Sequence, residues 1–370
     1  MPITLPPESD PRRQEIRRWL SDHPQPTARQ LAEAGYVAPH WPKPWGLAAD
    51  PELQLILDDE LTAAGIERPD NAIAIGWAGP TIVAGGTEAQ HQRWLPGILD
   101  GSEEWCQLFS EPESGSDLAS LRTKAVRDGD EYVVNGQKIW STWANRSQWG
   151  ILLARTDSEA PKHRGISYFV LDMSTPGIEV RKIVEMTGGN HFNETFLTDV
   201  RIPVENRIGP ENDGWKLAKV TLANERVSLS EGGVLWGMGP DANICLAEIK
   251  ARGAGADPIT RQRAARLYTN TRIIEWFSDK IVDAMMKGED PGPVASIRKA
   301  LADVHGQDLM SLVKDLSGPA GMIGDQSAES EELDPWHWGY LFSRALTIGG
   351  GTSEVQRNII GERLLGLPRD

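Results

Sequence analysis

Residues 110–144 read SEPESGSDLASLRTKAVRDGDEYVVNGQKIWSTWA, and with them the chain changes from a helical pattern to a β-prone one. The opening loop consists of small and hydroxyl residues, whose successive backbone N–H groups are suited to binding an anion. Asn135-Gly136 lies between β-prone runs and favours a type I′ turn, so we predict a hairpin over residues 131–140. Trp140-Ser141-Thr142 then sets a flat indole beside two hydroxyls, which suits a planar heteroaromatic ligand.

The pattern is helical on both sides of a β-prone region. In the N-terminal part, Thr27 is a plausible N-cap and residues 51–64 are amphipathic. Further strand candidates follow residue 144, at 150–155, 166–171, 178–184 and 195–202. Helical candidates return near 215–238 and at 259–286, 293–316 and 354–365.

This order predicts an α+β fold with three domains. We expect an N-terminal α-helical domain over residues 1–105, a middle β-sandwich or barrel over 106–207, and a C-terminal four-helix bundle over 208–370. Short strands without intervening helices are typical of a sandwich or barrel, which is why the middle region is assigned to one.

Composition excludes several classes of function. The 370 residues carry 38 basic and 53 acidic side chains, and a net charge of −15 suits neither nucleic acid nor an anionic membrane surface. The two cysteines, Cys106 and Cys245, form no CxxC pair, and the seven histidines show no HExxH spacing, so we expect no metal site. Without a signal-peptide-like start or a membrane-length apolar run, the chain is expected to be cytoplasmic.

A third cluster, residues 349–354, reads GGGTSE. Three glycines before a helix allow unusual backbone angles and close ligand approach, and the helix N-terminus offers N–H donors to an anion or carbonyl. Each cluster has a plain structural alternative when it is taken alone: a surface loop, a core aromatic residue and an N-capped turn.

Together, these clusters resemble the acyl-CoA dehydrogenases. Residues 110–144 resemble the flavin-binding β-domain of that family, and residues 200–215, VRIPVENRIGPENDGW, resemble the segment that leaves this domain. Residues 222–229, LANERVSL, resemble the start of the long helix behind the active site. Residues 349–370, GGGTSEVQRNIIGERLLGLPRD, resemble the C-terminal segment of the family. The resemblance covers essentially the whole chain. It implies the acyl-CoA dehydrogenase fold, FAD as cofactor, an acyl-CoA substrate and an electron-transfer flavoprotein as electron acceptor.

The resemblance also implies site residues. Those expected to bind FAD are Phe109, Ser110, Gly115, Ser116, Trp140, Ser141, Thr142, Thr352 and Glu354. Those expected to contact substrate are Ser116, Asn224 and Gly351. Thr142 matches the position that touches flavin N5, and Thr352 and Glu354 match positions near the adenylate.

The position of the catalytic base departs from the usual pattern. Most family members carry a glutamate immediately before the Gly-Thr of the last loop, where this chain has Gly350. A minority, including isovaleryl- and long-chain-type enzymes, carry the base on the long helix just before an arginine, which here is Glu225-Arg226. Glu225 is therefore expected to remove the α-proton, Arg226 to orient it, and the Gly350 N–H to polarise the thioester oxygen. The plain alternative for Glu225 is an exposed helix carboxylate.

Gly350 has no side chain, and the space that this leaves favours a bulky, branched or steroid-derived acyl group. An enzyme that acts on such a group has a role in lipid metabolism. The GGGT ending and the ERV motif look most like dehydrogenases acting on steroid side-chain CoA esters in actinobacteria.

Assembly departs from the family as well. Members present Arg-x-x-Phe-Gly to a neighbour's FAD, whereas residues 250–263 read KARGAGADPITRQR, with Arg252 or Arg261 as partial substitutes. Asp315 stands where members offer glutamine and is expected to repel a diphosphate. These departures fit one half of an α2β2 heterotetramer with a paralogous subunit, and a homotetramer stays open. Two other functions also stay open: an FAD-deficient partner subunit, and an oxidase or flavin monooxygenase on the same fold.

Overall fold

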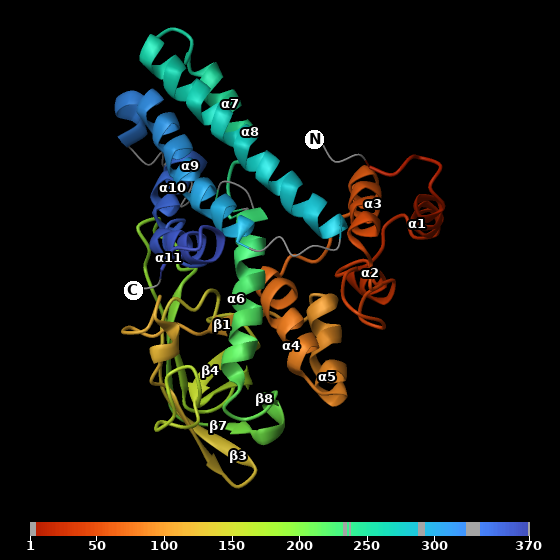
Figure 1. Ribbon diagram of the computed structural model, residues 1–370, viewed down its shortest axis with the longest axis vertical. Helices are drawn as coiled ribbons and strands as arrows, with labels where there is room; N and C mark the ends of the chain where they lie inside the picture. The colour runs from red at the N-terminus through yellow and green to blue at the C-terminus, as the bar shows by residue number, and fades with distance from the viewer. Residues whose placement is uncertain (1–4, 232–234, 237, 288–292, 323–333, 369–370) are drawn as a thin grey trace, which may run out of the picture. The chain divides into compact units, whose positions relative to one another are not determined.

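The computed structural model describes residues 5–231, 235–236, 238–287, 293–322 and 334–368 (Figure 1). The chain divides into two compact units. In its described part, the first unit holds residues 5–185 and 190–224, and the second holds residues from 225 onward with the short segment 186–189. The division into three domains, with boundaries expected after residues 105 and 207, stays a prediction.

Helices form the N-terminal part of the first unit. They are α1 (Pro11–Asp22), α2 (Ala28–Glu33), α3 (Pro51–Ala63), the π-helical turn η1 (Ala74–Ala78), α4 (Gly79–Gly85) and α5 (Glu88–Leu99). Thr27 caps α2 as predicted, because its hydroxyl accepts a hydrogen bond from Gln30 N. The side-chain oxygen of Gln30 accepts from Thr27 N, which completes a capping box.

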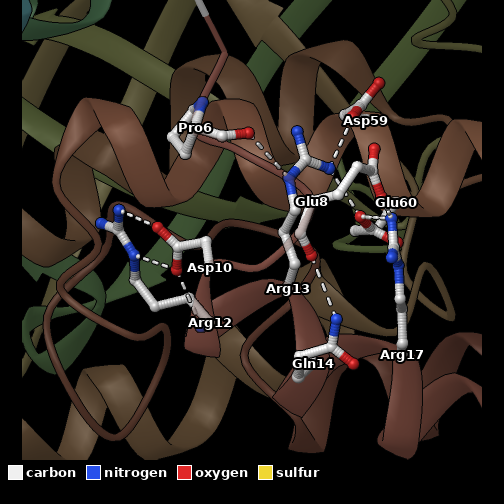
Figure 2. A network of polar contacts seen from close by, with 9 residues as sticks. All are labelled: Pro6, Glu8, Asp10, Arg12, Arg13, Gln14, Arg17, Asp59 and Glu60. Carbon is white, nitrogen blue, oxygen red and sulfur yellow. Dashed lines mark hydrogen bonds and ion pairs between the residues drawn. The ribbon is translucent and has the colours of Figure 1, made fainter.

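A buried arginine joins α1 to α3 (Figure 2). Arg13 is 2% exposed, and its Nη1 donates to Glu60 Oε1 over 2.5 Å while its Nε donates to the carbonyl oxygen of Pro6 over 3.1 Å. Arg17 Nε donates to the other oxygen of Glu60 over 2.7 Å. Because a buried charge is stable only when it is paired, this network holds the two helices in one register.

The rest of the first unit is dominated by a single eight-stranded sheet, ordered β6-β7-β3-β2-β4-β5-β8, with β1 pairing parallel to β4. The strands are β1 (Trp105–Leu108), β2 (Lys124–Asp128), β3 (Glu131–Lys138), β4 (Trp149–Arg155), β5 (Ile166–Asp172), β6 (Ile178–Lys182), β7 (Asn193–Pro203) and β8 (Arg207–Ile208). Over residues 105–208, all of them described, only 3-10 turns at Leu118–Ser120 and Val204–Asn206 interrupt this pattern. The predicted β-rich middle region is confirmed.

The hairpin predicted over residues 131–140 is wrong. β3 runs through Asn135 and Gly136, pairing with β2 on one side and β7 on the other, with a register shift between Val134 and Gly136. The Asn135 side chain spans this bulge to Asp199, and a Cβ at Gly136 would lie 2.3 Å from Thr123 Oγ1. The Asn-Gly pair therefore serves a bulge and a close backbone approach, while the chain reverses around Gly129, at φ +65°.

The second unit is helical. α6 (Gly214–Glu231) begins in the first unit and enters the second at Glu225; α7 (Ala242–Ala251), α8 (Pro258–Met286), α9 (Val294–Leu316), α10 (Pro335–Phe342), α11 (Ser353–Ile359) and a π-helical turn (Ile360–Leu364) follow. α9 packs against α7, α8, α10 and α11. The predicted C-terminal bundle and its two long helices are confirmed. α7 and α10 have no counterpart among the predicted helices, since both are short and lie beside Gly- and Pro-rich segments.

Candidate active site

A buried ion pair between Glu111 and Lys138 holds the loop that follows β1. Glu111 is 8% exposed and accepts from the backbone N–H groups of Arg122 and Thr123, over 2.6 and 2.9 Å. It also pairs with Lys138 Nζ at 2.9 Å, and the same ammonium donates to the Phe109 carbonyl over 3.0 Å. The sequence gives no sign of this partnership, because it joins a loop to a strand.

Burial and charge act against each other in this pair. Burial lowers the pKa of Lys138 to about 8, and the Glu111 carboxylate only partly offsets that. Burial alone would raise the pKa of Glu111, but the Lys138 charge and the hydrogen bonds to its carboxylate outweigh burial and leave that pKa lowered. Both groups are therefore mainly charged at neutral pH.

The predicted flavin residues of this loop differ in exposure, and Phe109 is buried at 3% exposed. Gly115 and Ser116 are exposed, and a Cβ at Gly115 would meet nothing within 4 Å in the described part of the chain. Ser110 is half-buried, and its carbonyl accepts from Ile139 N over 2.9 Å. That bond ties the loop to the end of β3, so Phe109 and Ser110 lie next to the segment that carries the predicted indole.

The Trp140–Thr142 segment has an unusual backbone. Trp140 and Trp143 have φ of +62° and +56°, a region that costs free energy for bulky residues. The turn is held by β7 and the residues before it: Ser141 N donates to Asn193 O over 3.0 Å, and Asn193 Nδ2 donates back to Ser141 O over 3.1 Å. This strain is maintained by surrounding contacts, as is typical of ligand-binding turns.

The same segment presents groups that fit a flavin. The Trp140 indole is 57% exposed, while Thr142 beside it is half-buried. Among the described residues, the buried atoms Ser141 Oγ, Asn193 Oδ1 and Thr195 Oγ1 have no hydrogen-bond partner. An exposed indole suits stacking against a planar ring such as the flavin of FAD, and the Ser141 hydroxyl of the same turn is a candidate partner for the edge of that ring, so the turn fits FAD.

In the second unit, the glycine loop before α11 is locked by a residue that the sequence motif does not single out. Gly350 and Gly351 have φ of +65° and +89°, and buried Gln356 donates Nε2 to both of their carbonyls over 3.1 Å. A Cβ at residue 351 would lie 2.8 Å from that Nε2. Thr352 is the N-cap of α11, accepting from Val355 N over 3.3 Å, and Glu354 lies exposed in the first turn.

α9 holds the segment that leads into this loop. Gln307 Nε2 donates to Ser343 O and Thr347 Oγ1, over 3.0 and 3.2 Å. Lys299, itself paired with Asp303 at 2.6 Å, donates to Leu346 O over 3.3 Å, and burial raises the pKa of Asp303 to about 6. The glycine loop is thus fixed on both of its flanks.

The remaining predicted residues lie on or near helices. Asn224 Nδ2 donates to Val220 O over 2.9 Å, Glu225 is half-buried on α6, and the side chain of Arg226 lies outside the described part. The predicted residues up to Asn224 belong to the first unit, and those from Glu225 onward belong to the second.

One charge argument from the sequence is not supported. Asp315 is not an uncompensated acid, because its carboxylate pairs with Arg263 at 2.7 Å. Arg252 pairs with Glu248 at 2.5 Å and donates to the Ser317 hydroxyl. Repulsion of a diphosphate by Asp315 is therefore not expected.

Among the described residues, every helix is too short or too polar to span a bilayer. The same residues contain no group of three or more His, Cys, Asp or Glu side chains placed to hold a metal ion.

Comparisons with known proteins agree along the chain. Profiles of the acyl-CoA dehydrogenase N-terminal, middle and C-terminal domains match residues 7–102, 106–200 and 212–365. Acyl-CoA dehydrogenase FadE34 of Mycobacterium tuberculosis is 43% identical over 92% of this chain, which spans 46% of that relative's length. The match to the ChsE4-ChsE5 complex from Mycobacterium tuberculosis covers 100% of both chains, with 31% identity and a TM-score of 0.78. The Tcur3481-Tcur3483 steroid ACAD matches over 97% of both chains, with 30% identity and a TM-score of 0.78.

Proposed function

The chain belongs to the acyl-CoA dehydrogenase family of oxidoreductases, and on that premise we propose that it catalyses FAD-dependent α,β-dehydrogenation of an acyl-CoA thioester. The observation that carries this proposal is the combination of Gly350, which offers no carboxylate, with Glu225 one residue before an arginine on α6. The loop at Ser110–Ser116 and the Trp140–Thr142 turn supply the surface expected to bind the cofactor.

Each chemical task then has a candidate in this chain. Glu225 removes the α-proton of the thioester, a step for which a positioned base contributes about 10²–10⁴-fold. The backbone N–H of Gly350 donates to the thioester oxygen, where negative charge develops. The Ser110–Ser116 loop and the Trp140–Thr142 turn would hold FAD, which would supply a hydride acceptor for the β-hydrogen. Ser116, Asn224 and Gly351 contact the substrate, and Arg226 orients the base.

For the substrate, we favour a bulky acyl group of the steroid-derived class. A glycine at position 350 leaves space beside the reacting carbons, and one structural relative is named a steroid ACAD. Turnover of linear, branched and steroid-derived CoA esters tests this choice. Faster turnover of linear esters than of steroid-derived esters contradicts it.

For assembly, we favour an α2β2 heterotetramer with a paralogous subunit and electron transfer to an electron-transfer flavoprotein. Residues 250–263 lack the Arg-x-x-Phe-Gly segment, and one structural relative is a complex of two named proteins. A subunit of this kind binds its own FAD and depends on its partner to complete the cation set around the diphosphate.

The decisive experiment compares the wild-type chain with Glu225→Gln in the assembled, FAD-loaded protein. Stopped-flow reduction of the flavin by the best CoA ester of the panel measures the chemical step directly. Retention of near-wild-type reduction by the Gln variant rules out Glu225 as the base.

A further inference from the structure

Three buried hydroxyl groups meet inside the first unit. Thr81 lies on α4, Tyr168 on β5 and Thr221 on α6, and each is 0% exposed. The hydroxyls of Thr81 and Thr221 are 2.8 Å apart, and those of Tyr168 and Thr221 are 3.1 Å apart. A buried polar cluster between three elements is stable only when its hydrogen bonds are complete.

Two backbone carbonyls can take protons from the threonines of the cluster: that of Trp77 lies 2.8 Å from the Thr81 hydroxyl, and that of Leu217 lies 3.2 Å from the Thr221 hydroxyl. Whichever threonine donates to the other, every proton of the cluster has an acceptor when Tyr168 donates to Thr221. Thr221 then accepts from Tyr168. Tyr168 is the donor at the head of this chain, and burial raises the pKa of its phenol, which keeps the donor protonated.

The ring of Tyr168 meets the predicted flavin-binding loop. It lies edge-to-face against Phe109, with ring centroids 5.9 Å apart, and Phe109 directly precedes Ser110 and Glu111. Such aromatic pairs contribute beyond the area they bury and restrict ring orientation. One side chain thus contacts the base of the loop through its ring and α6 through its hydroxyl.

The hydrogen bond to Thr221 matters for the proposed base because of where Thr221 lies on α6. Glu225 follows Thr221 by four residues, about one turn, so the two lie on the same face of the helix. One turn earlier, Leu217 packs so closely on α4 that a Cβ at Gly85 would lie 2.5 Å from its Cδ2. The contacts Gly85–Leu217 and Thr81–Thr221 repeat at helical spacing on both helices, so the hydroxyl chain fixes the register of α6.

We propose that Tyr168 is a positioning residue for the dehydrogenation: its ring supports the flavin-binding loop at Phe109, and its hydroxyl fixes the turn of α6 that precedes Glu225. The inference rests on the proposed roles of Glu225 and of that loop. The two halves of one side chain therefore serve two different parts of the reaction and are separable by substitution.

The test uses the assembled protein with FAD and the best CoA ester of the panel. Tyr168→Phe keeps the ring and removes the donor, Tyr168→Leu removes both, and Thr221→Val breaks the chain at its centre. Thr271→Val is the matched control, because Thr271 is another buried threonine that bonds to a side chain, His305, over 2.9 Å. FAD affinity, the flavin-reduction rate with its pH profile, and thermal unfolding are measured for each.

We expect Tyr168→Phe and Thr221→Val to slow flavin reduction about 10- to 100-fold and to shift the pKa of its pH profile, since small misplacements of a reacting group cost this much. The FAD dissociation constant stays within about twofold of wild type in both variants, but rises in Tyr168→Leu. Thr271→Val is expected to change thermal unfolding only.

If Glu225→Gln is inactive, so that the proposed base stands, either of two outcomes overturns the proposal for Tyr168. In one, Tyr168→Phe reduces flavin at the wild-type rate with an unshifted pH profile. In the other, Thr271→Val slows reduction as much as Tyr168→Phe, which assigns the loss to general destabilisation. An active Glu225→Gln variant instead overturns the proposed base, so the two failures are distinguishable.

Discussion

The ammonium of Lys138 lies 2.9 Å from the carboxylate of Glu111, with the two side chains 0% and 8% exposed. This ion pair connects β3 to the loop at Ser110–Ser116, because Lys138 ends β3 and Glu111 lies in that loop. Lys138 also donates to the carbonyl of Phe109, directly before the loop. The loop's exposed rim therefore rests on a buried charge pair, and breaking that pair affects the surface that is proposed to bind FAD.

Glu111→Gln leaves the Lys138 ammonium buried without its counter-charge. We expect a loss of about 3–5 kcal/mol in the free energy of unfolding, measured by urea denaturation, together with weaker FAD binding. Glu113→Gln on the same loop is the control, because Glu113 pairs with Arg122 at the surface, where both side chains are exposed and such a pair contributes about 0–1 kcal/mol. Equal effects of the two substitutions would contradict this account.

Glu225→Gln is expected to lower the rate of flavin reduction about 100-fold or more, while FAD and CoA-ester binding stay nearly unchanged. Adding Gly350→Glu to this variant restores a carboxylate at the position used by most family members. We expect partial recovery on unbranched esters, because residue 350 has φ +65° and a non-glycine residue there costs about 1–2 kcal/mol. Full recovery on bulky esters would show that the acyl group does not need the space at position 350.

Arg13→Met is expected to destabilise the first unit by about 3–5 kcal/mol, because it removes one buried partner of Glu60. Arg18→Met on the same helix is the control, since Arg18 is exposed. Thermal or urea unfolding at pH 7 measures the difference, and similar losses in the two variants would contradict the role of the buried pair.

The same network predicts a pH dependence. Burial alone would raise the pKa of Glu60, but hydrogen bonds from Arg17 and Arg13 outweigh it and hold that pKa below its usual value. The stabilisation is therefore present above the unfolded-state pKa and is lost as the pH falls through the lower, folded-state pKa. Unfolding curves between pH 7 and pH 3 should show a smaller loss for Arg13→Met than for wild type.

Expressed alone, the chain is expected to bind FAD incompletely, because residues 250–263 lack the segment that family members offer to a neighbour's diphosphate. Co-expression with a paralogue that retains Arg-x-x-Phe-Gly should give a heterotetramer with one FAD per pair of chains. Mass photometry and the flavin-to-protein ratio measure both quantities. A stable, active homotetramer with one FAD per chain would contradict the heterotetramer proposal.

Features that depend on neighbouring residues could be predicted from the sequence. Thr27 and Thr352 are N-caps because a threonine hydroxyl reaches a backbone N–H three residues later, whatever the rest of the fold does. The long helices α8 and α9 follow from apolar spacing along one segment. The family's motifs are equally local, which is why the candidate residues could be named before any contact between them was known.

Features that depend on distant partners required the folded chain. Asn135-Gly136 carries the local signal of a turn, but pairing with β2 and β7 on both sides makes it part of a strand. Lys138 and Arg13 are charged residues that sequence patterns assign to the surface, and each is buried because a carboxylate from another element neutralises it. Burial and charge compensation are properties of residue pairs that are separated along the chain, so spacing within one segment does not encode them.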